Sequence, residues 1–247
     1  RAGQPGILHE AAPDDIAFIQ FSSGSTGEPK GVVLSHSNLL ANMRAIVLCS
    51  GATTDDSSLS WMPLTHDMGL IGMHLIMMYA GVRQYLMPTD LFVRRALLWM
   101  KFANQKRVTI TSSPNFGYRH FLRALGDKTL DGHDLSSLRL VCNGAEPISV
   151  ELADEFLDRM APYGLRRTTM YPVYGLAEAS LAVTGCADLI DNESEGALMF
   201  DIGGGSSELA WLDFRGGRPK RQGRMSSSIR SWQSLPVGVV SIAEKFG

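Results

Sequence analysis

The chain has 247 residues, 45% of them hydrophobic and 19% charged. This composition excludes a disordered chain and predicts one large or two modest globular domains. The formal net charge of −2 excludes a strong global attraction to nucleic acid or to an acidic membrane, so a small-molecule partner is expected.

Cysteine usage and apolar run length bear on the compartment. Cys49, Cys142 and Cys186 are odd in number and lack metal-ligand spacing, which predicts free thiols in a reducing, cytoplasmic environment. The longest apolar stretch, residues 68–82, is shorter than the roughly 18 residues of a membrane span and predicts a buried helix without a transmembrane segment. The chain starts with Arg1 and shows no signal peptide, so we expect a fragment of a longer protein.

Residues 16–181 alternate short apolar runs with longer amphipathic ones, which is typical of an α/β fold. A strand is expected at 16–21. A helix follows, with Ser37 and Asn38 as candidate caps. Further strands, each followed by a helix-compatible segment, are expected at residues 58–62, 83–87, 107–112, 138–143 and 169–174.

The pattern changes beyond about residue 186. Strands are expected within 197–214 and 229–240, joined by a segment rich in glycine and arginine. The cations of that segment have no interleaved acids or aromatic residues, which favours a solvated hairpin loop over a nucleic-acid site.

Residues 22–31, SSGSTGEPKG, have the composition of a phosphate-binding loop. Glycines let backbone N–H groups face phosphate oxygens, hydroxyl groups add donors, and Lys30 supplies positive charge. The string is not a Walker A motif, because Gly31 stands where that motif has Ser or Thr; a flexible Ser/Gly loop is the alternative. It resembles the signature loop of adenylate-forming enzymes, the superfamily of acyl-CoA synthetases and acyl-AMP ligases. The residues assigned to ATP there are Ser22, Ser23, Gly24, Ser25, Thr26, Gly27 and Lys30.

Three further segments carry the same resemblance in the same order. Residues 61–72, WMPLTHDMGLIG, resemble a segment of fatty acyl-AMP ligases centred on His66 and Asp67, although a helix cap is the bland alternative. Residues 112–118 resemble the ligases' Pro-Asn-Phe segment near the acyl tunnel. Residues 143–148, NGAEPI, predict a turn at the carboxyl end of a strand, where α/β sheets bind ligands. By resemblance, Gly144, Ala145 and Glu146 contact the adenine, and a plain β–α turn is the alternative.

Residues 171–183 contain a Tyr-Gly-x-x-Glu motif formed by Tyr174, Gly175 and Glu178. A carboxylate at a helix start suits Mg²⁺, which prefers oxygen ligands and bridges phosphates, so Glu178 is the metal candidate. A surface or capping glutamate is the alternative. Tyr174 and Gly175 are assigned to the nucleotide by resemblance, and Ala177, where many relatives have Thr, favours the fatty acyl-AMP ligase branch.

The resemblance implies layered sheets with helices, as in the amino-terminal domain of adenylate-forming enzymes, and an enzyme that uses ATP and Mg²⁺ to convert a fatty acid to acyl-AMP and pyrophosphate. Lys30, His66 and Glu178 are the implied catalytic residues, and an acyl carrier protein or coenzyme A is the implied acceptor. The family's ribose-binding aspartate and its carboxyl-terminal domain with a lysine are not recognisable here. Poor or absent turnover is therefore expected.

Residues 200–209, FDIGGGSSEL, form a second Gly-rich string that could hold phosphate, or could be a plain β-turn. Together with residues 234–247 it resembles a fragment of exopolyphosphatase and guanosine pentaphosphate phosphatase proteins, which have an actin-like fold. The expected domains are residues 1–185, adenylate-forming, and 186–247, phosphatase-like. A phosphatase or an inactive nucleotide-binding module is the alternative function. The second phosphate loop comprises Asp201, Gly203, Gly204, Gly205 and Ser206.

Overall fold

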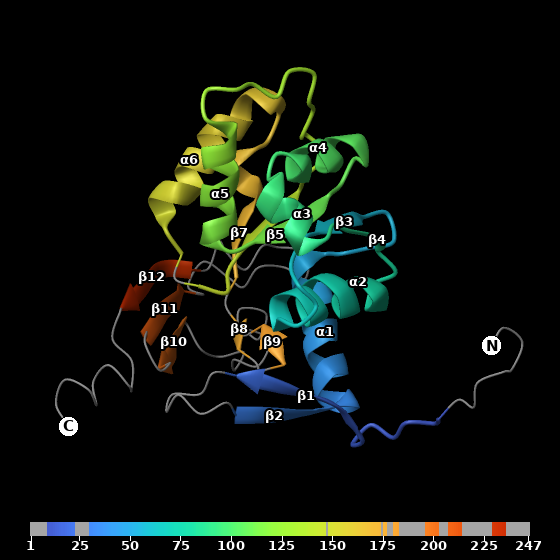
Figure 1. The fold of residues 1–247 in the computed structure, drawn as a ribbon. Coiled ribbons are helices and arrows are strands. Elements are labelled where there is room, and N and C mark those ends of the chain that lie inside the picture. The colour runs from blue at the N-terminus through green and yellow to red at the C-terminus, as the bar shows by residue number, and fades with distance from the viewer. Residues whose placement is uncertain are drawn as a thin grey trace, which may run out of the picture.

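The computed structural model describes residues 9–22, 30–146, 148–173, 175–176, 180–182, 196–202, 207–213 and 229–235. A five-stranded sheet organises most of these residues (Figure 1). Its strands are β3 (Ser57–Ser60), β4 (Arg83–Leu86), β5 (Ile110–Ser113), β6 (Leu140–Asn143) and β7 (Met170–Pro172). They pair in the order β4-β3-β5-β6-β7, and every pair is parallel. The expected α/β fold with strands near these positions is confirmed.

One face of this sheet is covered by four helices, which lie together in Figure 1. They are α3 (Thr89–Arg94), α4 (Leu98–Gln105), α5 (Asn115–Leu125) and α6 (Val150–Met160). Aromatic rings fill the space between them and the sheet: Trp61 stacks on Phe92 with ring centroids 3.9 Å apart, and Trp99 contacts Tyr118 and Phe156. Each such ring contributes roughly 1.5–3 kcal/mol through burial, which makes this face the larger core.

The opposite face carries α1 (His36–Ser50) and a helix in two forms. Residues Met68–Leu75 form a π-helix, which continues as α2 (Ile76–Tyr79). The buried helix expected over residues 68–82 is therefore present, but its first half is wider than an α-helix. Residues apolar on every side give no periodicity from which the helix type could be predicted.

The amino-terminal hairpin differs from expectation. Strand β1 (Ile16–Ser22) pairs antiparallel with β2 (Lys30–Ser35), a strand that the sequence analysis missed. The N-cap of α1 is Ser35, not Ser37: its side chain accepts the Asn38 N–H, and the Asn38 side chain accepts the Ser35 N–H. This reciprocal capping fixes where the helix starts, directly after β2.

The last described strands are antiparallel. Strands β8 (Gly175–Leu176) and β9 (Leu181–Ala182) form a small pair. Strands β10 (Gly196–Ile202), β11 (Ser207–Asp213) and β12 (Ile229–Leu235) form a three-stranded sheet in that order, which lies where strands were expected. Short 3₁₀ turns at Ala161–Tyr163 and Arg167–Thr169 precede β7.

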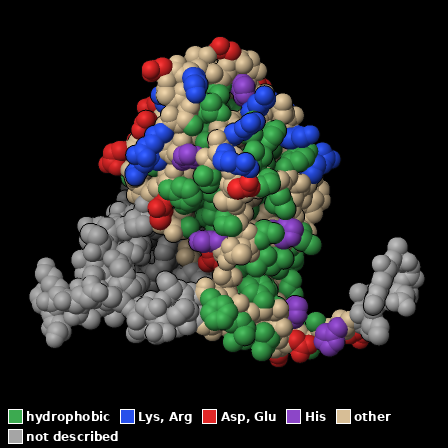
Figure 2. All heavy atoms as spheres, viewed as in Figure 1, with side chains coloured by type: hydrophobic (Ala, Val, Ile, Leu, Met, Phe, Trp, Pro, Cys, Tyr) green, Lys and Arg blue, Asp and Glu red, His purple; other side chains and the backbone are tan. Residues whose placement is uncertain are grey.

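The surface divides by chemistry in the view of Figure 2. Lys and Arg side chains gather over the helices drawn at the top of Figure 1, and hydrophobic side chains gather around α1 and the β1–β2 hairpin. The exposed apolar side chains there include Ile16, Phe21, Val33 and Leu40. In the described ranges, no helix combines the length and the hydropathy needed to cross a membrane.

Candidate functional site

A tight turn follows β6 at the carboxyl edge of the parallel sheet. A Cβ added to Gly144 would lie 2.5 Å from the backbone oxygen of Val173, so only glycine fits. The Val173 N–H donates to the Asn143 carbonyl at 2.8 Å, which holds the turn against the chain leaving β7. Ala145 adopts a φ of 70°, a left-handed conformation that costs a non-glycine residue free energy. The Gly-Ala turn expected here is present, at the edge where α/β sheets bind ligands.

Glu146 ties this turn to the neighbouring helix. Its Oε1 accepts the backbone N–H of Phe116 at 2.6 Å. Phe116 lies in the first turn of α5, where unsatisfied N–H groups and the positive end of the helix dipole favour a carboxylate. The structure thus gives Glu146 a role as a helix cap, and its assignment to the nucleotide stays a prediction.

His66 and Asp67 lie at the start of the π-helix. The His66 Nδ1 and Asp67 Oδ1 atoms are 2.8 Å apart, and both face the Met68 N–H, at 3.1 and 2.6 Å. The hydrogen bond to Asp67 raises the pKa of His66 above its ordinary value of 6.5, against the opposing effect of burial. Since one nitrogen cannot accept and donate together, protonation of Nδ1 directs it to Asp67 and leaves Met68 bonded to the carboxylate alone.

Next to these two motifs lies a largely apolar pocket of about 110 Å³. Its walls come from both ends of the sheet and from α1, the π-helix and α2, which cover one face of the sheet. Asp67, Ala145 and Gly175, each from a motif singled out in the sequence, line it at the carboxyl edge. The remaining lining residues are Ile46, Cys49, Ser50, Met68, Gly72, Met73, Ile76, Met77, Ile110, Ser112, Leu140, Cys142, Tyr171, Val173 and Leu181.

Two polar groups in this region are buried without a hydrogen-bond partner among the described residues. These are the Ser112 Oγ, from a residue that lines the pocket, and the Asn143 Oδ1. The other side-chain atom of Asn143, Nδ2, donates to Asn115 at 3.0 Å. Burying a polar group without a partner costs free energy, so the carboxyl edge retains capacity to accept or donate further hydrogen bonds.

The first phosphate loop is described only at its ends. Ser22 and Lys30 are paired across the β1–β2 hairpin, so the loop between them starts and finishes at adjacent positions. Ser23, Gly24, Ser25, Thr26 and Gly27 lie outside the described residues. A hairpin fits the expected loop better than the strand-to-helix turn of a Walker motif.

The remaining assigned residues fall in part outside the described ranges. Tyr174 and Glu178 lie outside them, so the structure does not test whether Lys30 and Glu178 face one cleft. Asp201 lies in β10 opposite Glu208, and the other residues of the second phosphate loop, Gly203, Gly204, Gly205 and Ser206, are not described. Among the described residues, no group of three or more His, Cys, Asp or Glu could hold a metal ion.

Sequence reasoning located about half of the pocket wall, because many of its lining residues lie in residues 61–72, 112–118, 143–148 and 171–183, and it missed the rest. Cys49 and Cys142 were noted only as thiols, and both line the pocket. Burial raises the pKa of Cys142 to about 12, so this thiol stays protonated and unreactive. For the rest of the wall the sequence offered the apolar face of α1, which includes Ile46, and the apolar run at residues 68–82, and both indicate burial without indicating a cavity.

The fold and the pocket define an enzyme domain of the adenylate-forming class, with a parallel sheet, a Gly-Ala turn at its carboxyl edge and an apolar pocket beneath. Residues 3–219 match the family described as AMP-binding enzyme, and the chain belongs to this family.

Curated relatives point to one branch of the family. The chain is 40% identical over 181 residues to the medium-chain-fatty-acid–[acyl-carrier-protein] ligase TtuA of Teredinibacter turnerae, covering 72% of this chain and 28% of that protein. It is 40% identical over 171 residues to the corresponding ligase JamA of Moorena producens, covering 69% and 29%. The chain therefore spans less than a third of the length of these relatives.

Solved structures of fatty acyl-AMP ligases are also similar to this chain. The fatty acid AMP ligase from Legionella pneumophila has a TM-score of 0.68 and 36% identity, over 78% of this chain and 33% of that chain. A fatty acyl-adenylate ligase from L. pneumophila, in complex with acyl adenylate and pyrophosphate, has a TM-score of 0.70 and 29% identity, over 92% and 45%. The family match continues past residue 185, and the comparisons give no support to the exopolyphosphatase resemblance.

Proposed function

We propose that this chain carries the part of a fatty acyl-AMP ligase that binds the acyl group and ATP. The observation that carries the proposal is the apolar pocket, whose carboxyl-edge lining includes Asp67, Ala145 and Gly175. An alkyl chain gains free energy in such a pocket, and its carboxylate is then left at the sheet edge where α/β folds place reacting groups. This is the arrangement that an acid-activating enzyme needs.

The proposed reaction joins the acid to the nucleotide. A carboxylate oxygen attacks the α-phosphorus of ATP, the bond from that phosphorus to the bridging oxygen breaks, and pyrophosphate leaves. Because the transferring phosphoryl group carries negative charge, catalysis depends on positioning and on positive charge around it. Lys30 and the N–H and hydroxyl groups of residues 22–27 are proposed to hold the β- and γ-phosphates.

Two groups are proposed at the nucleotide. The turn at Gly144 approaches Val173 closely and its next residue, Ala145, lines the pocket, and the small residues of this turn are proposed to lie against the flat adenine ring. Glu178 is proposed to bind Mg²⁺ together with substrate phosphates, which agrees with the use of one or two carboxylates in most such Mg²⁺ sites. His66, whose neighbour Asp67 lines the pocket, is proposed to lie beside the reacting carboxylate.

The acyl acceptor is proposed to be a thiol of an acyl carrier protein, because two relatives are named as ligases of that protein; coenzyme A is the other thiol to test. The division of the chain at residue 185 stays a proposal, and the family match, which extends to residue 219, counts against it.

A binding and product assay with the chain tests this function. ATP with Mg²⁺ should raise the free energy of unfolding, by about 2.7 kcal/mol at a hundredfold excess over Kd. Because poor or absent turnover is expected, decanoate with ATP should yield at most slow formation of acyl-AMP, measured by mass spectrometry. Lys30→Ala should remove both effects. Lys106→Ala, a change at an exposed residue outside the pocket, is the matched control. ATP stabilisation that is equal in the Lys30 and Lys106 variants would exclude the proposed phosphate loop.

A further inference from the structure

The apolar pocket runs the length of the parallel sheet. At the carboxyl edge it is lined by Ala145 and Gly175, and at the opposite edge by Ile110 and Leu140, the first residues of β5 and β6. Cys49 and Ser50 line it from the last turn of α1. Since α1 leads through a short turn to the start of β3, its last turn lies at the amino edge of the sheet. The pocket therefore ends at α1.

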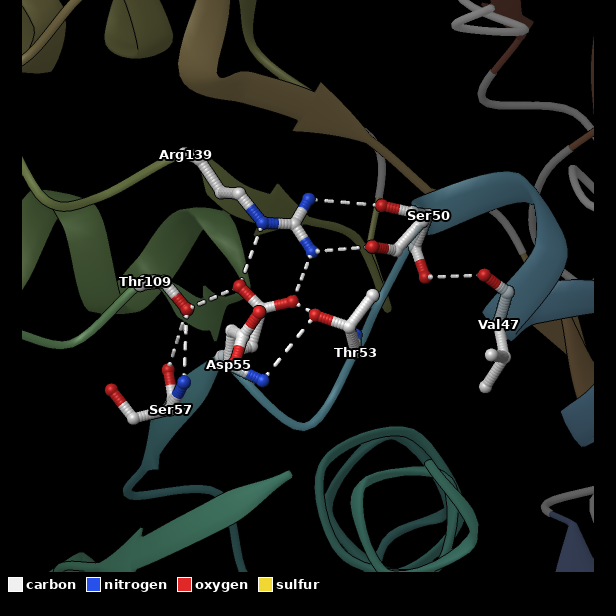
Figure 3. A network of polar contacts seen from close by, with 9 residues as sticks. Val47, Ser50, Thr53, Asp55, Ser57, Thr109 and Arg139 are labelled. Carbon is white, nitrogen blue, oxygen red and sulfur yellow. Dashed lines mark hydrogen bonds and ion pairs between the residues drawn. The ribbon is translucent and has the colours of Figure 1, made fainter. Parts of the chain in front are cut away.

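The end of α1 is fixed to the sheet by one arginine, shown in Figure 3. Arg139 immediately precedes β6, and its Nη1 and Nη2 donate to the carbonyls of Ser50 and Gly51 at 2.9 and 3.1 Å. The last carbonyls of a helix have no partner within the helix, so these bonds satisfy groups that would otherwise require water. The guanidinium thus joins the helix end to the sheet.

The same guanidinium is fixed by a buried carboxylate. Asp56 is 7% exposed and accepts from Arg139 Nε at 2.8 Å and Nη2 at 2.6 Å. Thr109 Oγ1 donates to it at 2.7 Å, and the Thr53 N–H at 3.0 Å. Burial raises the pKa of Asp56, but these hydrogen bonds lower it by more, so the pKa lies below its ordinary value. The carboxylate is therefore ionised at neutral pH. Four segments meet at the Arg139–Asp56 ion pair: the end of α1 and the residues that lead into β3, β5 and β6.

We propose that Cys49 closes the acyl pocket and sets the longest fatty acid that it accepts, with Arg139 and Asp56 as positioning residues that hold the α1 end in place. This rests on the proposed function of the pocket. The α1 end is hydrogen-bonded to the Arg139 guanidinium, which in turn makes two hydrogen bonds to the buried Asp56 carboxylate, so this wall cannot yield to a longer chain without breaking charge-assisted bonds. The end of the pocket is therefore a rigid stop and not a flexible lining.

The sheet gives a scale for that stop. From Leu140 to Cys142 the strand rises ~7 Å, and the chain from Leu140 to Ala145 reaches at most ~16 Å. With carbon–carbon bonds of about 1.5 Å, an extended alkyl chain advances roughly 1.3 Å per carbon, so the path along the sheet is as long as an extended chain of about six to twelve carbons. Acids of sixteen or more carbons should not fit in extended form.

Protection of the Cys49 thiol measures how deep an acid reaches. The chain is treated with N-ethylmaleimide in the presence of saturated acids from hexanoate to hexadecanoate, each kept below its micelle-forming concentration, and alkylation is followed by peptide mass spectrometry. Hexanoate should leave Cys49 reactive, and decanoate or dodecanoate should slow its alkylation at least tenfold. Cys142 serves as an internal reference, because its protonated thiol should not react with or without acid.

A neighbouring thiol supplies the matched control. Leu48 is 48% exposed and does not line the pocket, so a Leu48→Cys, Cys49→Ser variant should react equally with every acid. Equal protection of Cys49 by bound hexanoate and dodecanoate, or its full reactivity while dodecanoate is bound, would overturn the proposal. Binding is scored separately by thermal stabilisation: if no acid binds at all, the proposed function fails as well.

Two substitutions test the stop and its support. Cys49→Trp should weaken dodecanoate binding by about fourfold per methylene excluded and leave hexanoate binding unchanged, whereas Leu48→Trp should change neither. Arg139→Gln should admit hexadecanoate, and Arg139→Lys, which keeps charge without the fork, should restore the limit only in part. A purely structural role for Arg139 would lower stability without altering the length limit, and that result would overturn its assignment as a positioning residue.

Discussion

Asp56 offers the sharpest test of how the fold is held together. Asp56→Asn removes the charge that faces Arg139 and turns an amide N–H₂ group toward its guanidinium donors. Loss of one hydrogen bond to a charged group costs about 1.5–3 kcal/mol, and removing one partner of a fully buried pair costs about 3–5 kcal/mol. Because Arg139 keeps 31% of its side-chain surface exposed, water solvates the unpaired cation in part. We expect the free energy of unfolding to fall by about 2–3 kcal/mol.

Urea denaturation at pH 7, followed by far-UV circular dichroism, measures this difference. Asp55→Asn is the matched control: Asp55 is the preceding residue, is exposed, and has no ion pair among those found in the described residues. This substitution should change the free energy of unfolding by no more than about 0.5 kcal/mol. If the two variants lose equal stability, the ion pair is not what holds the end of α1, and the argument for a rigid pocket end fails with it.

The contribution of Asp56 to the free energy of unfolding depends on pH with a definite sign. The folded pKa of Asp56 lies below its ordinary value of 3.8, so the folded state binds this proton less readily than the unfolded state. The stabilisation is therefore present above about pH 4 and is lost as the pH falls through the folded pKa. Asp56→Asn should remove this part of the acid-side decline, and an unchanged decline would contradict the assigned pKa direction.

Three further outcomes are expected. Gly144→Ala should lower stability by about 1–3 kcal/mol and weaken ATP binding, since the new Cβ would lie 2.5 Å from the Val173 oxygen; a variant with unchanged melting and ATP affinity would refute that contact. Ala145→Gly should raise stability by up to about 1 kcal/mol, because glycine adopts the φ of 70° without strain, as measured by urea denaturation. Asp67→Asn should lower the pKa of His66, observed by NMR titration of the imidazole. Because the folded pKa of His66 is raised, protonated His66 stabilises the protein below about pH 6.5, and this stabilisation is lost as the pH rises through the folded pKa. The Asp67→Asn variant should lose that pH dependence.

Much of the α/β core could be predicted because local patterns determine it. Strands β5 and β6 each begin with an apolar residue, Ile110 and Leu140, and each is followed by an amphipathic helix. Strand β2 was missed because Val32, Val33 and Leu34 show no alternation, and because its pairing with β1 depends on closing a loop whose length the pattern does not reveal. The helix cap was displaced by two residues for the same reason.

The site was predictable only where chemistry is concentrated in a few adjacent residues. The turn at Gly144 could be located because a close backbone approach demands glycine. The pocket as a whole could not, because its wall also includes residues as distant in sequence as Cys49 and Leu140, and each of them alone resembles ordinary core. Likewise, the pairing of Asp56 with Arg139 spans 83 positions, a separation across which a single sequence carries no signal.

The π-helix at Met68–Leu75 has a consequence for how this family of pockets can diversify. Its i→i+5 bonding, seen where the Ile76 N–H reaches the Ile71 carbonyl, accommodates one residue more per turn than an α-helix would. Deleting a single residue there should restore α-helical bonding and change the direction in which the downstream residues face about the axis. Met73, Ile76 and Met77, which line the cavity, would then shift relative to the sheet, so one codon lost or gained could reshape this wall of the binding site while the sheet stays intact.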